Sequence, residues 1–218
     1  MINVLVDFSN VFGVARDQGC RPTCIAFAAS DAHSHWRDKH IFTHLSPEYA
    51  FYFAAQRQLP TTHLQGVRTG AIFDAIAIDG QPAEEHFPYQ HQGTSVDPLT
   101  APKIPFLHPT YKNSGSYKHG NTSDVVSCLQ KNVTPVLAIN ITRAFQRASK
   151  IAAIVEDHPV DMQVGAHAVV AVGHGKGIDG KEYIKIRNSW GDGWGDSGHA
   201  WLSEAYLNRR MNWLATYT

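Results

Sequence analysis

The chain has 218 residues and equal numbers of basic and acidic side chains, 19 of each, so its net charge is zero when histidine is neutral. A phosphate-binding surface needs an excess of Lys and Arg, and this balance therefore excludes nucleic acid as the main partner. Because 43% of the residues are hydrophobic and no apolar run reaches the roughly 18 to 20 residues that cross a bilayer, the composition indicates a folded protein with no membrane partner.

The first half of the chain contains three predicted helices. They cover 23–36, with Thr23 as a candidate N-cap, then 46–57, which opens on Ser-Pro-Glu, and 70–78, which stops at Asp-Gly. Apolar residues recur at three- and four-residue spacing in the first of them. Ser at the cap and Pro at the first helical position are the usual start signals, and they mark the second helix.

The second half of the chain is mostly strand. Residues 90–122 contain repeated Pro and Gly that break every periodic pattern, so we expect a long irregular crossover there. Ser123 and Asp124 offer a cap for a short helix that ends near Gln130. Enrichment in β-branched residues, or alternation of apolar and polar ones, then predicts strands over 136–141, 167–172, 183–187 and 199–202.

These elements predict an α+β protein made of one domain over 1–218. A helical lobe over 18–89 packs against a mainly β lobe over 123–218, and residues 90–122 connect them. Clefts between lobes are common sites of chemistry, so we expect the functional site there.

The cysteine count indicates a protein that does not depend on disulfides. Cys20, Cys24 and Cys128 allow one bridge at most, and one thiol must remain free. This favours a reducing compartment. The first residues have no basic region, long apolar core or small-residue cleavage site, so we interpret them as the start of a domain and not as a signal peptide.

Cys24 is the first candidate for chemistry. It lies at the predicted start of the first long helix, where free backbone N–H groups and the helix dipole favour negative charge, so we expect its thiolate to be stabilised. Gln18 lies six residues earlier in the turn-forming sequence Arg-Asp-Gln-Gly, and its amide can donate a hydrogen bond to an oxyanion. Taken alone, Cys24 is more often a buried structural cysteine.

His167 and Asn188 are the second and third candidates. His167 opens an apolar strand after a Gly-Ala step, and Asn188 ends a later strand in the sequence Asn-Ser-Trp-Gly. An Asn there can bind one imidazole nitrogen and so orient the other, while Trp190 can shield that bond from water. Each feature alone has a structural interpretation. Together with Gln18 and Cys24, however, they form a set of nucleophile, base and orienting residue.

With these residues in this order, the chain resembles the papain-like cysteine peptidases over nearly its whole length, in a prokaryotic-type version. The resemblance rests on 17–19 with 23–27, on Leu45-Ser46-Pro47-Glu48, on Phe87-Pro88-Tyr89, on 165–173 and on 188–198. It implies a two-lobed papain-like fold, with a helical N-terminal lobe, a barrel-like β lobe and the active-site cleft between them. It implies no cofactor.

The chain departs from the family pattern around the nucleophile. Arg21 stands where the family's usual disulfide cysteine would be, and Cys20 is one position out of register. We therefore expect the bridges of lysosomal and secreted members to be absent. Ile25 replaces the usual aromatic residue.

The resemblance also suggests substrate-binding residues. Gly66 and Gly70 both remain candidates for the glycine that hydrogen-bonds the substrate backbone, and Ala166, just before the histidine, is a third candidate. No metal site is expected. His33 and His35 lie two residues apart on a predicted helix, so they do not share a face, and no Cys/His group has zinc-binding spacing.

The activity implied by the resemblance is peptide-bond cleavage through an acyl-enzyme. The Cys24 thiolate, paired with protonated His167, would attack a carbonyl of a protein or peptide substrate. Gln18 and the Cys24 backbone N–H would hold the oxyanion, Asn188 would fix the imidazole, and Trp190 would cover it. Two alternatives stay open: a deamidase or acyltransferase that uses the same triad, and a non-catalytic binding module.

The resemblance further suggests how activity is restrained. Few residues precede Gln18, whereas the family usually carries an N-terminal inhibitory segment. We therefore expect a mature or excised catalytic domain, or the toxin domain of a larger bacterial effector, with a propeptide or an immunity protein as inhibitory partner. The lack of a signal peptide favours the cytoplasm, or a target-cell cytosol into which the chain is delivered.

Overall fold

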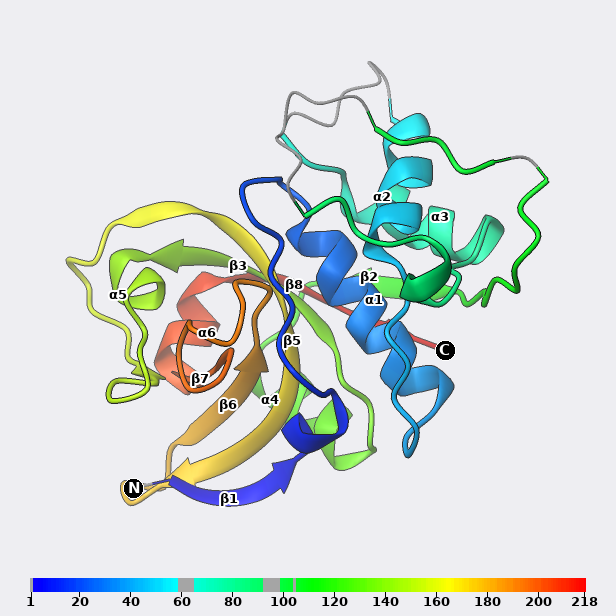
Figure 1. Ribbon diagram of the computed structural model, residues 1–218. Helices are drawn as coiled ribbons and strands as arrows, with labels where there is room; N and C mark the ends of the chain where they lie inside the picture. Colours follow the sequence, from blue (N-terminus) through cyan, green and yellow to red (C-terminus); the bar gives the residue numbers. More distant parts are fainter. Residues whose placement is uncertain (1, 59–64, 92–98, 104) are drawn as a thin grey trace.

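The computed structural model describes residues 2–58, 65–91, 99–103 and 105–218 (Figure 1). Its helices are α1 (Cys24–Arg37), α2 (Pro47–Gln56), α3 (Thr69–Ile78), α4 (Thr122–Gln130), α5 (Arg143–Gln146) and α6 (Glu204–Arg210), with 3-10 turns η1 (Ser9–Val11) and η2 (Glu84–His86). Its strands are β1 (Ile2–Asp7), β2 (Gly115–Lys118), β3 (Val136–Thr142), β4 (Ile154–Val155), β5 (Gln163–Gly177), β6 (Glu182–Arg187), β7 (His199–Ser203) and β8 (Met211–Tyr217). Figure 1 shows α1, α2 and α3 on one side and most strands curled together on the other, an α+β fold with two lobes.

The strands form one mixed sheet built around β5. Their order is β2-β8-β3-β5-β6-β7-β4, and β1 pairs with β5 outside this path. Within the described residues the pairs are antiparallel, except for the short parallel pair of β4 and β7. The first half of β5 pairs with β3, and its second half pairs with β6 and β1. This long strand therefore joins the two ends of the β lobe.

Two hydrophobic cores lie on opposite faces of β5, because successive side chains of a strand point to opposite sides. Ala168, Val170 and Val172 pack into the core that includes residues of α1, α2 and α3. Val169 and Ala171 pack into the core inside the β lobe. The alternation makes β5 the wall shared by both lobes, so a helix that packs on it is held close to the sheet.

The predicted helices are present, with small shifts at their ends. Ser46 caps α2 as predicted, because its side chain accepts a backbone N–H. Thr23 occupies the N-cap position of α1, but its side chain makes no capping hydrogen bond. The prediction of Ser123 or Asp124 as the cap of α4 is wrong. Asn121 caps this helix, since Asn121 and Asp124 exchange side-chain and backbone hydrogen bonds in a capping box.

The four predicted strands are present, and β5 extends well beyond 167–172. The expectation of an irregular 90–122 is wrong at β2, which pairs with β8; residues 92–98 and 104 lie outside the described part. β1 also makes the first half less purely helical than predicted, because it joins the sheet. Neither strand is predicted from the sequence pattern, because β2 is short and polar and the apolar residues of β1 are partly exposed. The lobe boundaries themselves stay a prediction.

All three cysteines are free thiols. Cys20 is exposed, while Cys24 and Cys128 are half-buried. In the described part of the chain, each helix is too short or too polar to cross a bilayer. Because all three cysteines are free, no disulfide holds the fold together.

Candidate active site

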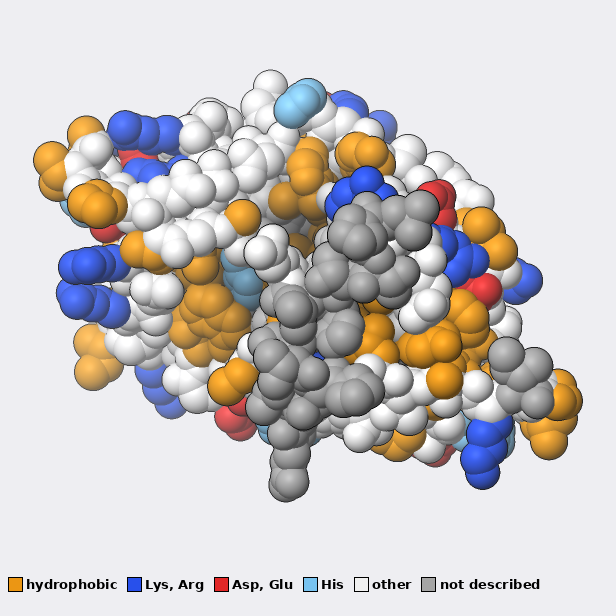
Figure 2. Space-filling model, turned by 90° about the horizontal axis from the view of Figure 1, so that it is seen from above, with side chains coloured by type: hydrophobic (Ala, Val, Ile, Leu, Met, Phe, Trp, Pro, Cys, Tyr) orange, Lys and Arg blue, Asp and Glu red, His pale blue; other side chains and the backbone are white. Residues whose placement is uncertain are grey.

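A cavity of about 410 Å³ opens where the start of α1 meets the β lobe. Gln18, Cys24, His167 and Trp190 all line it, although the sequence separates the first two from the last two by most of the chain. Figure 2 looks down on the upper side of Figure 1 and shows hydrophobic side chains in the hollows of this face, with most charged ones toward the margins. The fold thus brings the predicted nucleophile, base and oxyanion donor to one place.

The predicted substrate-binding residues divide into two groups. Gly66 and Ala166 line the cavity, whereas Gly70 lies inside α3 and does not. Gly66 has a φ of 89°, and a Cβ at this position would lie 2.9 Å from the carbonyl oxygen of Pro22. Only glycine therefore fits where the chain passes the loop that enters α1.

Cys24 is the first residue of α1 and is partly exposed to the cavity. Burial raises the pKa of its thiol, although hydrogen bonds from backbone groups, with that of Ala168 the largest, act to lower it. The expectation that the helix start makes the thiol more acidic is therefore wrong. Desolvation penalises the thiolate by more than the helix N-terminus favours it.

His167 and Asn188 form the closest contact of the site. Nε2 of His167 lies 2.6 Å from Oδ1 of Asn188, and the same oxygen accepts the backbone N–H of Ser189 at 2.8 Å. Since Oδ1 is an acceptor, the proton between the two side chains belongs to Nε2. Burial lowers the pKa of His167 to about 4, although the hydrogen bond to Asn188 acts to raise it. Burial therefore disfavours the protonated imidazole, and the hydrogen bond to Asn188 does not use Nδ1.

Aromatic rings surround this hydrogen bond. The ring centroid of Trp190 lies 4.6 Å from that of His167. Phe145 packs edge-on against both of these rings, and it lies 5.0 Å from Trp194, whose Nε1 donates to the carbonyl of Phe145. Asn188 itself is only 2% exposed. The cluster keeps water away from the hydrogen bond between His167 and Asn188, where a low local polarity strengthens it.

Gln18 joins the two sides of the cavity. Its backbone N–H donates to the carbonyl of Ser189, and the Ser189 hydroxyl donates to Oε1 of Gln18 at 2.7 Å. Oε1 is thus the acceptor, which assigns Nε2 as the donor end of the amide. One Nε2 proton is used by the carbonyl of Arg21 at 2.8 Å. The second N–H is the group that Gln18 can present to a ligand in the cavity.

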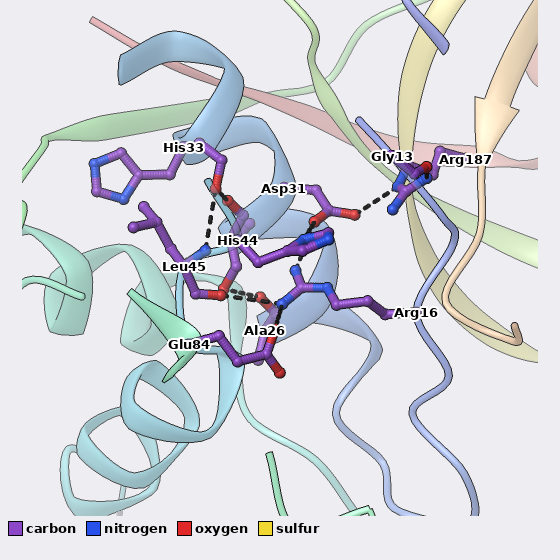
Figure 3. A network of polar contacts seen from close by, with 12 residues as sticks. Gly13, Arg16, Ala26, Asp31, His33, His44, Leu45, Glu84 and Arg187 are labelled. Carbon is purple, nitrogen blue, oxygen red and sulfur yellow. Dashed lines mark hydrogen bonds and ion pairs between the residues drawn. The ribbon is translucent and has the colours of Figure 1, made fainter. Parts of the chain in front are cut away.

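A buried ion network, shown in Figure 3, ties α1 to the β lobe. Asp31 lies two turns after Cys24, and its two oxygens bind Arg16 at 2.5 Å and Arg187 at 2.9 Å. Arg187 is 2% exposed and precedes Asn188 in the chain. The pKa of Asp31 falls to about 2, because the attraction of both arginines outweighs the cost of burial. No pattern in the sequence predicts this network, since Asp31 and Arg187 meet across 156 residues.

The two α1 histidines, His33 and His35, have protein partners. Nδ1 of His33 lies 3.0 Å from Oε1 of Gln81, and Nδ1 of His35 lies 3.1 Å from Oγ1 of Thr134. Over the residues that the structure describes, His, Cys, Asp and Glu side chains do not gather in threes that could hold a metal ion.

Comparison with known proteins connects this geometry to a family. Papaya proteinase 4 from Carica papaya is 56% identical over 42 residues, which are 19% of this chain and 12% of that protein. Cysteine proteinase 3 from Entamoeba histolytica is 24% identical over 204 residues, which are 91% of this chain and 62% of that protein. The chain therefore spans less than two thirds of the length of these relatives.

Solved structures show the same fold. Xylellain, a cysteine protease from Xylella fastidiosa, superposes with a TM-score of 0.76 at 20% identity, over 100% of this chain and 87% of that one. The procathepsin B S9 of Trypanosoma congolense gives a TM-score of 0.75 at 16% identity, over 100% and 78% of the two chains. The sequence model of the papain family of cysteine proteases matches residues 7–213. The chain belongs to the papain family of cysteine proteases.

Proposed function

We propose that the protein is a cysteine endopeptidase that cleaves peptide bonds in protein substrates through an acyl-enzyme. The observation that carries this proposal is the 2.6 Å contact between His167 Nε2 and Asn188 Oδ1 on the wall of the cavity that Cys24 and Gln18 also line. Asn188 occupies one imidazole nitrogen and so leaves Nδ1 to exchange a proton with the thiol.

The first step is proton transfer from Cys24 Sγ to His167 Nδ1. Burial disfavours each charge alone, so the thiolate and the imidazolium form together, each stabilised by the other. Sγ then attacks the carbonyl carbon, a C–S bond forms, and negative charge moves to the carbonyl oxygen. Nε2 of Gln18 and the backbone N–H of Cys24 hold that oxygen.

The remaining steps use His167 twice. Collapse of the tetrahedral adduct breaks the C–N bond, and His167 Nδ1 gives its proton to the leaving amine, which leaves a thioester on Cys24. A water molecule then attacks the thioester while Nδ1 takes its proton. The C–S bond breaks, the proton returns to Sγ, and the carboxylic acid product leaves.

The lining of the cavity supports a preference for apolar substrate side chains. Its described part includes Val67, Ala138, Ile141 and Trp213 and has no Asp, Glu, Lys or Arg. A charged side chain placed there would lose hydration without gaining a partner. We therefore propose that the enzyme favours substrates that place an uncharged, apolar side chain against these four residues.

The test is a cleavage assay on whole bacterial lysate, with the wild-type chain compared to Cys24→Ala and new N-termini mapped by mass spectrometry. New termini that depend on Cys24, with apolar residues enriched at a fixed distance from the cut, are the expected result. Release of ammonia or formation of cross-links without new termini would replace the proposal with a deamidase or acyltransferase. A Cys24 that resists alkylation at neutral pH, with no product of any kind, would favour a binding module.

We also propose that a bound segment or partner restrains the enzyme. Several structures with this fold are proforms, including a procathepsin L 3 of Tenebrio molitor and a ragweed pollen protease in its proform. A propeptide, or an immunity protein if the chain is the toxin domain of a bacterial effector, would fill the same cavity. Three free thiols suit action in a reducing cytosol. Co-expression with neighbouring open reading frames, followed by pull-down and activity assays, would identify or exclude such a partner.

A further inference from the structure

The loop that carries the oxyanion donor is fastened by a buried ion pair. This oxyanion loop, residues 18–24, runs from Gln18 to the nucleophile and contains no disulfide, since its cysteines are free. Arg21, in its middle, is 5% exposed, and Glu48 on α2 is completely buried. The guanidinium binds both carboxylate oxygens, NH2 to Oε1 at 2.9 Å and NH1 to Oε2. A paired, two-pronged contact of this kind fixes orientation as well as distance.

Tyr89 contacts both the Arg21 guanidinium and the backbone and side chain of the oxyanion loop. The guanidinium carbon of Arg21 lies 4.9 Å from the centre of the Tyr89 ring. The Tyr89 hydroxyl donates to the carbonyl of Gln18 at 2.8 Å, and it lies 2.8 Å from Oγ1 of Thr23, whose hydroxyl therefore donates to it. One phenol group thus joins the start of the loop to the residue just before Cys24.

The fastened loop controls where the Gln18 amide points. Nε2 of Gln18 donates to the carbonyl of Arg21, so a shift of the Arg21 backbone moves the donor. We propose that Arg21, Glu48 and Tyr89 are positioning residues that hold the Gln18 Nε2 donor in place for the transition state. This inference rests on the proposed peptidase function, and it gives the buried ion pair a role in turnover as well as in folding.

The expected effect follows from the geometry of oxyanion binding. Removal of one oxyanion donor costs about 100- to 1,000-fold in turnover, and a displacement near 1 Å of a catalytic group costs on the order of 100-fold. Weakening the contacts of Arg21, Glu48 and Tyr89 should therefore lower kcat by about 10- to 100-fold. Reaction of Cys24 with iodoacetamide forms no oxyanion, because the thiolate displaces iodide at a tetrahedral carbon. That reaction should keep its rate.

The experiment measures both reactions in the same variants. Tyr89→Phe removes only the hydroxyl and keeps the ring on which Arg21 stacks, and Glu48→Gln removes one charge of the pair. For both, kcat on a peptide substrate should fall while KM, the alkylation rate and its pH profile stay within about twofold of the wild type. Arg57→Gln is the control, since it breaks a 2.6 Å ion pair with Asp79 in the same lobe without touching the oxyanion loop.

A wild-type chain that does not hydrolyse the peptide would overturn the proposed function itself, whereas Gln18→Ala separates failure of this inference from failure of the oxyanion assignment. If Gln18→Ala loses turnover while Tyr89→Phe and Glu48→Gln keep it, the positioning role is wrong and the oxyanion role stands. If turnover and alkylation fall in parallel in both positioning variants, the fastening is merely structural and the inference is also overturned. If Gln18→Ala itself keeps wild-type turnover, the oxyanion assignment and the inference fail together. Should Glu48→Gln not fold, Tyr89→Phe decides the outcome alone.

Discussion

The two walls of the cavity are held by opposite kinds of interaction. The wall that carries Cys24 depends on buried charges: Arg21 with Glu48 beneath the loop, and Asp31 with two arginines behind α1. The wall that carries His167 depends on aromatic packing, with tryptophan and phenylalanine rings around one neutral hydrogen bond. A buried charge that loses its partner is costly, whereas an aromatic cluster loses packing by degrees. We therefore expect one substitution in the first wall to cause a large loss of stability, and one in the second wall to cause a small loss of activity.

Acid should destabilise both walls of the cavity, and we expect its effect on the free energy of unfolding to be the largest of those predicted. Burial lowers the pKa of His33 on α1 and of His167 on β5 to about 4. The unfolded chain, with histidine pKa near 6.5, binds more protons between these values, so stability is complete above about pH 6.5 and is lost as pH falls toward 4. For each histidine, the free energy of unfolding is lower by about 3 kcal/mol below pH 4 than above pH 6.5. Urea unfolding followed by tryptophan fluorescence from pH 7.5 to 4.5 measures this.

A matched variant shows whether the histidines cause that acid sensitivity. His33→Asn keeps a donor for Gln81 but cannot be protonated near neutral pH. Its stability should change less between pH 7 and pH 5 than that of the wild type. Equal slopes for the two proteins, or a wild-type stability that is flat down to pH 4.5, would contradict the prediction.

Cys24→Ala removes the proposed nucleophile from the wall of the cavity that carries the buried charges. Cys24→Ala should lower peptide hydrolysis by at least about 10⁴-fold, as expected when one member of a cooperative catalytic unit is lost. The free energy of unfolding at pH 7 should change by no more than about 1 kcal/mol, because the thiol is uncharged at that pH in the folded and the unfolded chain and the substitution removes a single half-buried sulfur atom. Initial rates on a peptide amide and a thermal melt measure the two quantities. Residual hydrolysis above 1% of wild type would mean that another group attacks the substrate.

Asp31→Asn tests whether the loss of one buried charge causes a large loss of stability. It leaves Arg16 and Arg187 without their shared carboxylate, so the free energy of unfolding should fall by about 3 kcal/mol. Because the pKa of Asp31 is lowered to about 2, its contribution is complete above about pH 4 and is lost as pH falls through 2. The difference from wild type should therefore stay constant from pH 8 to 5. Asp79→Asn, at a half-buried pair, is the control and should cost less than about 1 kcal/mol.

Trp190→Ala should give the smallest effect and show the gradual failure of the aromatic wall. Water would reach the hydrogen bond between His167 and Asn188, and kcat should fall about 5- to 10-fold, which corresponds to roughly 1 kcal/mol. Trp190→Phe should recover most of the loss. Trp201→Phe, at a half-buried tryptophan on β7 beside Lys185, serves as control. A loss in Trp190→Ala as large as that of Cys24→Ala would show that the ring does more than shield.

Local patterns predict much of the fold, and they fail where partners are distant. The Ser46 cap and the alternation in 136–141 depend on neighbours in sequence, so helices and central strands follow from them. Strands β1 and β8 become strands by pairing with β5 and β3, and this pairing is invisible in a short window. The predicted cap of α4 is two or three residues too late for a different reason: Asn121, Ser123 and Asp124 are all plausible caps, and the capping box selects Asn121.

The candidate site shows the same division. Cys24, His167, Asn188 and Gln18 are identifiable because the chemistry needs those residue types in a known order, and the cavity brings three of them together, with Asn188 behind His167. The choice between Gly66 and Gly70 needs the structure, since only the former has the left-handed backbone and the position on the cavity. The direction of the Cys24 pKa also needs it, because burial depends on what packs nearby.

Local periodicity and residue identity are enough to predict the fold class, the family and the candidate catalytic side chains. How those side chains are held depends on the packing of helices and strands, which brings Arg21 to Glu48 across 27 residues and Asp31 to Arg187 across 156. The physical reason is that a buried charge is stable only beside its partner. That partner is chosen by how helices and strands pack in space, and the linear order of the residues does not encode it in any short pattern.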